Sequence, residues 1–283
     1  MKHIIESQQF DLRSIDKIFA VADYLEKKSD NSLKGKIMAS LFYEPSTRTR
    51  FSFESAMLRL GGSVITTESA KEFSSAAKGE TLEDSIRVIG NYADVIVLRH
   101  SEEGSAEKAA SVSSVPIVNA GDGSGQHPTQ ALLDLYTIKR ELGKIEGITI
   151  ALVGDLKHGR TIRSLSYLLG KYKNIKIYFV SPSGLRVGND VKEYLKKHSV
   201  TYSETDDLKS VLRDVDVLYQ TRIQKERFKT AKEYNKYNGC YTVDLGVVKQ
   251  MKRKSIIMHP LPRVGEILPE VDDSPKAVYF KQT

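Results

Sequence analysis

Residues 148–155 read ITIALVGD, a run of mostly branched apolar side chains that ends in glycine and aspartate. Such a run, without alternating polar residues, is typical of a strand buried on both faces of a parallel sheet. A helical pattern follows, because Ile162, Leu165 and Leu169 recur at the spacing of one helix face. The stretch therefore predicts one strand–helix unit of an α/β fold.

Similar units lie on both sides of this stretch. We interpret the following apolar runs as strands: KIMASLFY (36–43), GSVITT (62–67), ADVIVLRH (93–100), VPIVNA (115–120), IKIYFVSP (175–182), VDVLYQT (215–221), CYTVDL (240–245) and SIIMHP (255–260). Helical patterns separate them, as in TLEDSIRVIGNY (81–92). We predict an α/β protein with two doubly wound parallel-sheet domains, 1–130 and 131–283.

The segment HPTQALLDLYTIKRELG (127–143) lies between the two series. Pro128 suits the first position of a helix, and Gly143 suits its end. Apolar residues cover most sides of this helix, which is the pattern of a buried helix. We therefore expect it to join the two domains.

Composition limits the class of protein. The 283 residues are 40% hydrophobic and 28% charged, as in an ordinary globular protein. The one cysteine, Cys240, excludes a disulfide framework and suits a reducing compartment. The sequence begins without a signal-peptide pattern, and no apolar run approaches the ~18 residues of a membrane span. We expect a cytoplasmic protein that does not bind membranes.

The net charge of +7 favours anionic partners. The basic residues are spread along the chain, and the cluster KQMKRK (249–254) has no interleaved aromatic residues. We interpret this cluster as a solvated helix face, so we expect no nucleic-acid partner.

The motif EPSTRTR (44–50) lies where a helix is expected to begin. Ser46 or Thr47 suits the N-cap, but Arg48 and Arg50 fall in the first turn, where the helix dipole favours acidic residues. Backbone N–H groups, hydroxyls and guanidinium groups together match a phosphate. The alternative is a surface helix with solvated arginines.

Three further motifs carry polar residues that suit an anionic ligand. Arg99 ends a predicted strand, and Lys78 lies in the small-residue loop AKEFSSAAKGET (70–81), which is otherwise a plain solvent loop. His127 lies at the start of the 127–143 helix, where the dipole lowers the pKa of an imidazole. His127 is expected either to donate to a ligand oxygen as a neutral ring or merely to cap the helix.

The motif GDLKHGRT (154–161) differs at one residue from the phosphate-binding loop pattern G-x-x-x-x-G-K-[ST], because Arg160 takes the place of the lysine. A P-loop-like nucleotide-binding protein is therefore an alternative, although arginine does not replace that lysine well and suits a carboxylate equally. Arg222 and Gln224 follow a later predicted strand, and HPLPR (259–263) follows another.

The sequence has no G-x-S-x-G elbow, no Cys–His pairing, no close pair of histidine ligands and no dinucleotide fingerprint. We expect no metal and no cofactor. The many anion-binding groups predict an enzyme that brings two anionic substrates together and stabilises charge.

The sequence resembles the aspartate/ornithine transcarbamoylase family from about Ser14 to Thr283. The resemblance rests on seven motifs in the family's order, FYEPSTRTR, KGETLEDS, VLRH, GDGSGQHPTQALLDLYTI, VGDLKHGRT, TRIQKER and HPLPR. It implies transfer of the carbamoyl group of carbamoyl phosphate to the amino group of L-aspartate, a step of pyrimidine synthesis.

The resemblance also implies roles for residues that match the family's motifs. The phosphate would be held by Ser46, Thr47, Arg48 and Thr49. The carbonyl oxygen would contact Thr49, Arg99 and His127, and the carbamoyl amino group would contact Gln130 and the backbone of Leu261 and Pro262. The carboxylates of aspartate would contact Arg160, Arg222 and Gln224. Ser74 and Lys78, with Lys78 contacting both substrates, would come from an adjacent subunit, which implies a homotrimer with shared active sites.

The motif HPLPR indicates the aspartate branch of the family, because the ornithine branch usually carries HCLP at this position. Arg160, Arg222 and Arg263 also suit a dicarboxylate better than a cationic amino acid. Ornithine or another amino acid remains the alternative acceptor, and the sequence leaves regulatory chains possible. Family chains usually continue beyond the YFKQ region into a further helix that packs near the N-terminal helix, so we expect apolar side chains such as Ile18, Phe19, Ala22 or Leu25 to be exposed.

Overall fold

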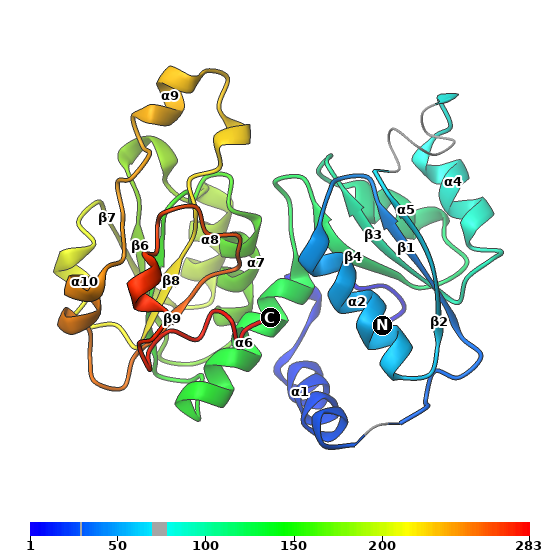
Figure 1. Cartoon of the computed structure of the whole chain (residues 1–283), viewed down its shortest axis with the longest axis horizontal. Coiled ribbons are helices and arrows are strands. Elements are labelled where there is room, and N and C mark those ends of the chain that lie inside the picture. The colour runs from blue at the N-terminus through cyan, green and yellow to red at the C-terminus, as the bar shows by residue number, and fades with distance from the viewer. Residues whose placement is uncertain (29, 70–77) are drawn as a thin grey trace. The chain divides into compact units, whose positions relative to one another are not determined.

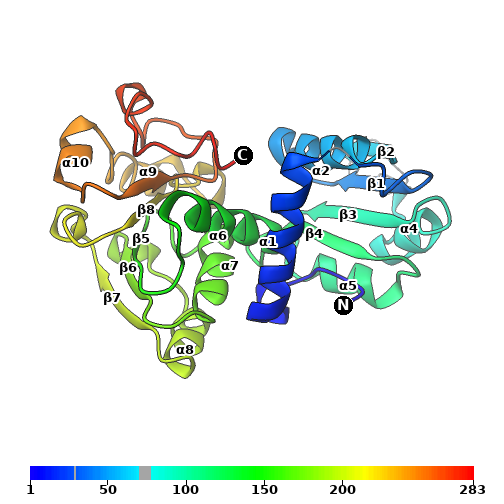
Figure 2. The same cartoon turned by 90° about the horizontal axis from the view of Figure 1, so that it is seen from below.

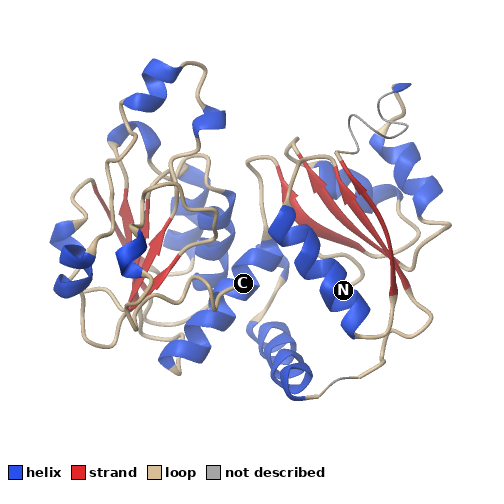
Figure 3. Ribbon diagram, in the orientation of Figure 1, coloured by secondary structure: helices blue, strands red, loops and turns tan. Residues whose placement is uncertain are grey.

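The computed structural model describes residues 1–28, 30–69 and 78–283. The chain forms two compact units, Met1–Gln130 and Ala131–Thr283. Each unit contains one parallel sheet with helices packed on it (Figure 1 and Figure 3). The predicted fold class, an α/β protein with two doubly wound parallel sheets, is confirmed.

The sheet of the first unit has the strand order β2-β1-β3-β4, and all of its pairings are parallel. Its strands are β1 (Ile37–Phe42), β2 (Ser63–Glu68), β3 (Val95–His100) and β4 (Ile117–Asp122). The helices of this part are α1 (Leu12–Lys27), α2 (Thr47–Arg59), α4 (Leu82–Ile89) and α5 (Ser105–Val112), with a 3₁₀ turn at Ser7–Gln9.

Two apolar clusters bury the faces of this sheet. Met57 of α2 packs with Met38, Phe42 and Val97 on one face. Ile86 of α4 and Ala109 of α5 pack with a different set of strand residues on the other face, Ala39, Leu41, Ile96, Leu98 and Ile117. The alternation of the two sets along β1 and β3 explains why these strands read as continuous apolar runs.

The sheet of the second unit has the order β7-β6-β5-β8-β9, again with parallel pairings. Its strands are β5 (Thr149–Val153), β6 (Lys176–Val180), β7 (Thr201–Thr205), β8 (Val217–Gln220) and β9 (Ile256–Met258). The helices are α7 (Arg160–Leu169), α8 (Asn189–Lys197), α9 (Ala231–Asn235) and α10 (Leu245–Gln250), and 3₁₀ turns lie at Ser183–Leu185, Lys209–Val211, Lys225–Arg227 and Pro269–Val271. In Figure 2, α7 and α8 lie on one side of this sheet and α10 on the other.

Helix α6 (Pro128–Leu142) crosses the boundary between the two units. Pro128 is its first residue, as predicted, and Ala131, Leu135 and Ile138 are fully buried. The predicted buried helix at the junction is therefore confirmed.

Local structure differs from the prediction in three places. The run 240–245 is not a strand, because Val243 makes only an isolated bridge with Ile267 and the Asp244 side chain caps α10. Strand β7 was not predicted, since TYSET carries no apolar run. Phe19 is buried rather than exposed, and Ile18, Ala22 and Leu25 are half-buried.

Candidate active site

The strand order reverses between β1 and β3 in the first unit. Ligands of open α/β sheets bind at such a reversal, beyond the carboxyl ends of the strands. Three predicted site segments follow these strands: Ser46–Thr49 follows β1, Arg99 lies at the end of β3, and His127 follows β4. The topology thus brings these three predicted carbamoyl phosphate segments to one edge of the sheet.

The two arginines of EPSTRTR have different environments. Nη1 of Arg50 lies 3.1 Å from Oε2 of Glu68, and its Nε lies 3.9 Å from Oε1 of Glu54. Two carboxylates within the same unit therefore balance the charge of Arg50. Arg48, two residues earlier in the same turn, is the residue predicted to contact a bound phosphate.

The first turn of α2 presents backbone donors. Ser46 occupies the N-cap position with extended backbone, but its side chain makes no capping hydrogen bond. The first N–H groups of a helix have no partner within the helix, so this turn can donate to an anion. The prediction that Ser46 or Thr47 caps the helix holds for the position of Ser46 and not for its hydroxyl.

Glu54 fixes α2 on the sheet. Its Oε1 accepts hydrogen bonds from the hydroxyls of Ser40 in β1 (2.9 Å) and Thr66 in β2 (2.7 Å). These bonds join the helix that carries Arg48 to two neighbouring strands.

Arg99 has an acidic neighbour that the sequence interpretation missed. Its Nε lies 3.4 Å from Oε2 of Glu44, and Nη1 donates to the carbonyl of Ala120 at 3.5 Å. Glu44 lies two residues after the end of β1, and an acidic residue just before two arginines was the available signal. The pair holds the Arg99 guanidinium at the edge where the phosphate residues lie.

His127 is 4% exposed, and its ring caps α6. The backbone N–H of Gln130 donates to Nδ1 of His127 at 3.4 Å. Since Nδ1 accepts, the neutral ring carries its proton on Nε2, which is then a donor. The two interpretations of His127, a cap and a donor to a ligand, are thus compatible.

Gln126, the residue before His127, connects the start of α6 to the N-terminal segment by hydrogen bonds. Oε1 of Gln126 accepts a hydrogen bond from the backbone N–H of Ser7 at 2.8 Å, and its Nε2 donates to Gln8 at 2.7 Å. The position of His127 therefore depends on residues 120 positions earlier in the chain.

In the second unit, the order reverses between β5 and β8. Gly154, the first residue after β5, has a φ of 119°, and a Cβ there would lie 2.5 Å from the carbonyl oxygen of Thr221. Gln224 donates through Nε2 to the carbonyl of His158 at 3.3 Å. The predicted aspartate segments around Arg160 and Arg222 are therefore adjacent, and Arg160 is the first residue of α7.

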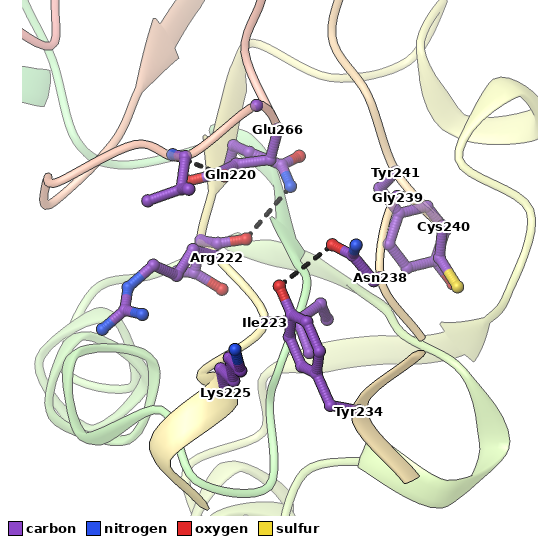
Figure 4. Close-up of a pocket in the computed structure, with 13 residues that line it drawn as sticks. Gln220, Arg222, Ile223, Lys225, Tyr234, Asn238, Gly239, Cys240, Tyr241 and Glu266 are labelled. Carbon is purple, nitrogen blue, oxygen red and sulfur yellow. Dashed lines mark hydrogen bonds between the residues drawn. The ribbon is translucent and has the colours of Figure 1, made fainter. Parts of the chain in front are cut away.

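A cavity of about 400 Å³ lies beside Arg222. Residues after β8, residues 238–241 and residues 264–266 line it, and Figure 4 shows Arg222, Lys225, Tyr234 and Glu266 around it. Of the four residues predicted to bind aspartate, Lys78, Arg160, Arg222 and Gln224, the lining includes Arg222.

HPLPR follows β9, the neighbour of β8 in the sheet. Both Nη atoms of Arg263 donate to the carboxylate of Asp272, and these bonds with the half-exposed acid fix the end of the motif. Leu261 has a φ of 52°, and its peptide bond to Pro262 is cis. The charge of Arg263 suggested that it binds a substrate carboxylate. In the structure, the guanidinium instead pairs with Asp272 of its own unit.

The predicted site residues are divided between the two units. Arg48, Arg99, His127 and Gln130 belong to Met1–Gln130, whereas Arg160, Arg222, Gln224, Leu261 and Pro262 belong to Ala131–Thr283. Lys78 is exposed before α4, and no hydrogen bond or ion pair joins it to the other site residues described. Ser74 lies outside the described residues.

Two classes of site are not found in the described ranges. Within 1–28, 30–69 and 78–283, no group of three or more His, Cys, Asp or Glu residues could hold a metal ion. Among the same residues, no helix is both long and apolar enough to cross a membrane.

Comparison with known proteins identifies relatives along the whole chain. Residues 2–140 match the family described as aspartate/ornithine carbamoyltransferase, carbamoyl-P binding domain, and residues 146–283 match its Asp/Orn binding domain. The chain is 57% identical to aspartate carbamoyltransferase 2, chloroplastic, of Pisum sativum over 99% of this chain and 74% of that protein.

Solved structures agree with this comparison. The catalytic subunit of Methanocaldococcus jannaschii aspartate transcarbamoylase has a TM-score of 0.91 and 54% identity, covering 100% of this chain and 93% of that one. Aspartate transcarbamoylase of Trypanosoma cruzi, in complex with carbamoyl phosphate and aspartate, has a TM-score of 0.93 and 43% identity over 99% and 92% of the two chains.

Proposed function

The chain belongs to the aspartate/ornithine carbamoyltransferase family, and we infer that it transfers the carbamoyl group of carbamoyl phosphate to the amino group of L-aspartate. The products are N-carbamoyl-L-aspartate and phosphate. The observation that carries this inference is that basic and polar side chains gather at the strand-order reversal of each sheet. Relatives of the same fold have been crystallised with both substrates.

The chemistry follows from the residues of the two clusters. The uncharged amine of aspartate attacks the carbonyl carbon, and negative charge develops on the carbonyl oxygen. We propose that Arg99, Thr49 and the Nε2–H of His127 stabilise that charge, as donors of an oxyanion hole do. The carbon–oxygen bond to phosphate then breaks, the phosphate leaves with the electron pair, and one of its oxygens accepts the proton of the amine.

The remaining cations bind the charged ends of the substrates. Arg48 and the first turn of α2 would hold the phosphate, together with the hydroxyls of Ser46 and Thr47. Arg160, Arg222 and Gln224 would hold the two carboxylates of aspartate. Holding both reactants in position supplies much of the rate enhancement without a covalent intermediate.

The alternative functions are less well supported. An ornithine carbamoyltransferase shares the carbamoyl phosphate residues, but the relatives reported above act, by name, on aspartate. The P-loop interpretation of GDLKHGRT is not supported, since residues 146–283 match the Asp/Orn binding domain. Phosphate release with L-aspartate and none with L-ornithine is the expected result, and the reverse pattern would refute the assignment.

We further propose a homotrimer in which Ser74 and Lys78 reach the site of a neighbouring subunit. Two observations support it. Lys78 is exposed and makes no described contact with the phosphate residues of its own unit. Helix α2 also exposes Phe51 (54%) and Leu58 (60%) seven residues apart on one face, an apolar stripe that a second copy can cover.

Solution mass and subunit mixing test the trimer. Arg48→Ala and Lys78→Gln variants should each be inactive alone. After dissociation and reassembly of a mixture, sites that combine an intact Arg48 with an intact Lys78 should restore part of the activity. A monomeric mass, or no recovery on mixing, contradicts the shared site. We place the protein in the cytoplasm because its one cysteine suits a reducing compartment, although the plant relatives are chloroplastic forms.

A further inference from the structure

The loop that carries Leu261 and Pro262 is held in an unusual conformation. Leu261 has a φ of 52°, in the left-handed region that few residues other than glycine, asparagine and aspartate adopt. Such a conformation persists only where the surroundings impose it, and it is most common at functional sites. The contacts that impose it are therefore of functional interest.

His259, two residues earlier, supplies one of these contacts. Its ring is 1% exposed, and Nδ1 accepts the backbone N–H of Leu261 at 2.7 Å. Nε2 lies 2.8 Å from Oε1 of Glu266. Because Nδ1 accepts from an N–H, it carries no proton, so Nε2 is protonated and donates to the carboxylate. The structure thus requires one neutral tautomer of His259.

Glu266 closes the other end of the loop. While Oε1 accepts from His259, Oε2 accepts the backbone N–H of Val264 at 2.9 Å. Burial alone raises the pKa of the Glu266 carboxyl, but the hydrogen bonds from His259 and Val264 outweigh it, so the pKa is lowered. Glu266 also lines the cavity beside Arg222 (Figure 4).

The backbone of His259 is fixed independently of its ring. Oε1 of Gln282 accepts the His259 N–H at 3.0 Å, and Nε2 of Gln282 donates to the buried Asp134 of α6 at 2.6 Å. Replacing the imidazole therefore removes the ring contacts while leaving this backbone anchor in place.

We propose that His259, supported by Glu266, is a positioning residue that holds the Leu261 backbone where it can bind the carbamoyl group. This inference rests on the proposed function and on the family resemblance, which implies that the backbone of Leu261 and Pro262 contacts the carbamoyl amino group. Protonation of Nδ1 would place two donors face to face, His259 Nδ1–H against Leu261 N–H, and would release the loop. Burial lowers the pKa of His259, and so do the nearby Arg222 and Arg263, while Glu266 opposes them.

Two amide variants separate the two ring contacts. In His259→Asn, the side-chain oxygen lies near the position of Nδ1 and can still accept from Leu261. In His259→Gln, the longer amide reaches toward Glu266 and leaves the Leu261 N–H without its acceptor. The Gln variant is expected to lose roughly tenfold or more in kcat/KM for carbamoyl phosphate, the loss typical of one hydrogen bond. The Asn variant should retain most of that value.

The pH profile adds a readout that a purely structural role would not change. His259→Asn removes an ionisation, so the acid limb of its kcat/KM profile should move to lower pH than in the wild type. Equal losses in the Asn and Gln variants, with unchanged acid limbs, would overturn the inference while wild-type activity with L-aspartate upholds the proposed function. Wild-type protein that does not turn over L-aspartate would refute the proposed function itself.

Nitrogen-15 NMR of the wild-type histidines tests the tautomer without any variant. At neutral pH, the His259 ring should carry its proton on Nε2 and none on Nδ1. A protonated Nδ1 would overturn the inference even where a variant fails to fold.

Discussion

The hydroxyl of Tyr219 in β8 donates a 2.7 Å hydrogen bond to Oδ2 of Asp134 in α6, and both residues are fully buried. Oδ1 of the same carboxylate accepts from Gln282 at 2.6 Å. Asp134 therefore connects helix α6, strand β8 and the segment that follows β9. A buried carboxylate is tolerated only when its oxygens have such donors.

Tyr219→Phe should destabilise the protein, because the buried carboxylate loses a donor while the packing of the ring is kept. The expected loss is about 1–3 kcal/mol in the free energy of unfolding, measured by denaturant titration. Tyr178→Phe is the matched control, since its hydroxyl bonds the exposed Asp214 at 3.0 Å. The control should change stability by less than about 0.5 kcal/mol. Equal effects of the two substitutions would show that the buried pair contributes nothing special.

Arg48→Ala should weaken carbamoyl phosphate binding by several kcal/mol, roughly a hundredfold or more in Kd, because a bound anion loses a charged partner. Calorimetric titration with carbamoyl phosphate measures this loss. Arg87→Ala is the control in the same unit: Arg87 lies on α4, pairs with Asp84 at 3.0 Å and is 59% exposed. The assignment of the phosphate site fails if the two variants bind carbamoyl phosphate equally well.

Apolar periodicity predicted most of the fold, because the central strands of both sheets are buried on both faces. Apolar periodicity failed where a strand is polar and where an apolar run does not form a strand. Strand β7 is a polar edge strand, with residues such as Thr201 and Ser203 exposed, so nothing apolar marked it. The run at 240–245 is rich in strand-forming residues, yet the Asp244 side chain accepts the Val247 N–H at 2.7 Å and starts a helix instead.

The sequence also indicated which residue types gather at the sheet edges, because the carboxyl ends of neighbouring parallel strands lie together. It did not show how those residues pair. Arg48 and Arg50 look equivalent in STRTR, and the sequence did not show that Glu54 and Glu68 lie beside Arg50. The bond between His259 and Glu266 was likewise invisible, since it depends on the left-handed turn at Leu261. Pairings of this kind are tertiary and have no local spacing rule.

Acid pH should expose the contribution of Asp272. Hydrogen bonds from Arg263 lower the pKa of this carboxyl, with burial acting in the opposite direction and Tyr279 adding to the lowering. A lowered folded pKa means that the stabilisation is complete above the unfolded value of about 3.9 and is lost as pH falls through the folded value.

Asp272→Asn should therefore be less stable than the wild type at pH 7, by about 1–3 kcal/mol. The difference should shrink as the pH falls below about 4, when the wild-type carboxylate also becomes neutral. Thermal or denaturant unfolding between pH 3 and 7 measures both values. Asp273→Asn, at the exposed neighbouring position, is the control and should show little difference at any pH. A difference for Asp272→Asn that stays constant down to pH 3 would contradict the ion pair as its cause.

Arg222→Ala should affect the other substrate. Arg222 follows β8 and lines the cavity of the second unit, so its removal should weaken the binding of an L-aspartate carboxylate. Loss of one charge-assisted contact corresponds to a rise of roughly 10- to 150-fold in KM for L-aspartate. Steady-state kinetics at saturating carbamoyl phosphate measures it, and Arg186→Ala, an exposed arginine of the same unit, is the control.

Together with Arg48→Ala, this variant tests whether the phosphate of carbamoyl phosphate and the carboxylates of L-aspartate are bound by cations of different units. If the first unit holds the phosphate and the second holds the carboxylates, carbamoyl phosphate affinity should change in Arg48→Ala and stay within about twofold of the wild type in Arg222→Ala. Loss of both affinities in both variants would mean that the clusters do not act separately. Loss of carbamoyl phosphate affinity in Arg222→Ala alone would reverse the assignment, because the cation at the β5–β8 reversal would then be serving the phosphate.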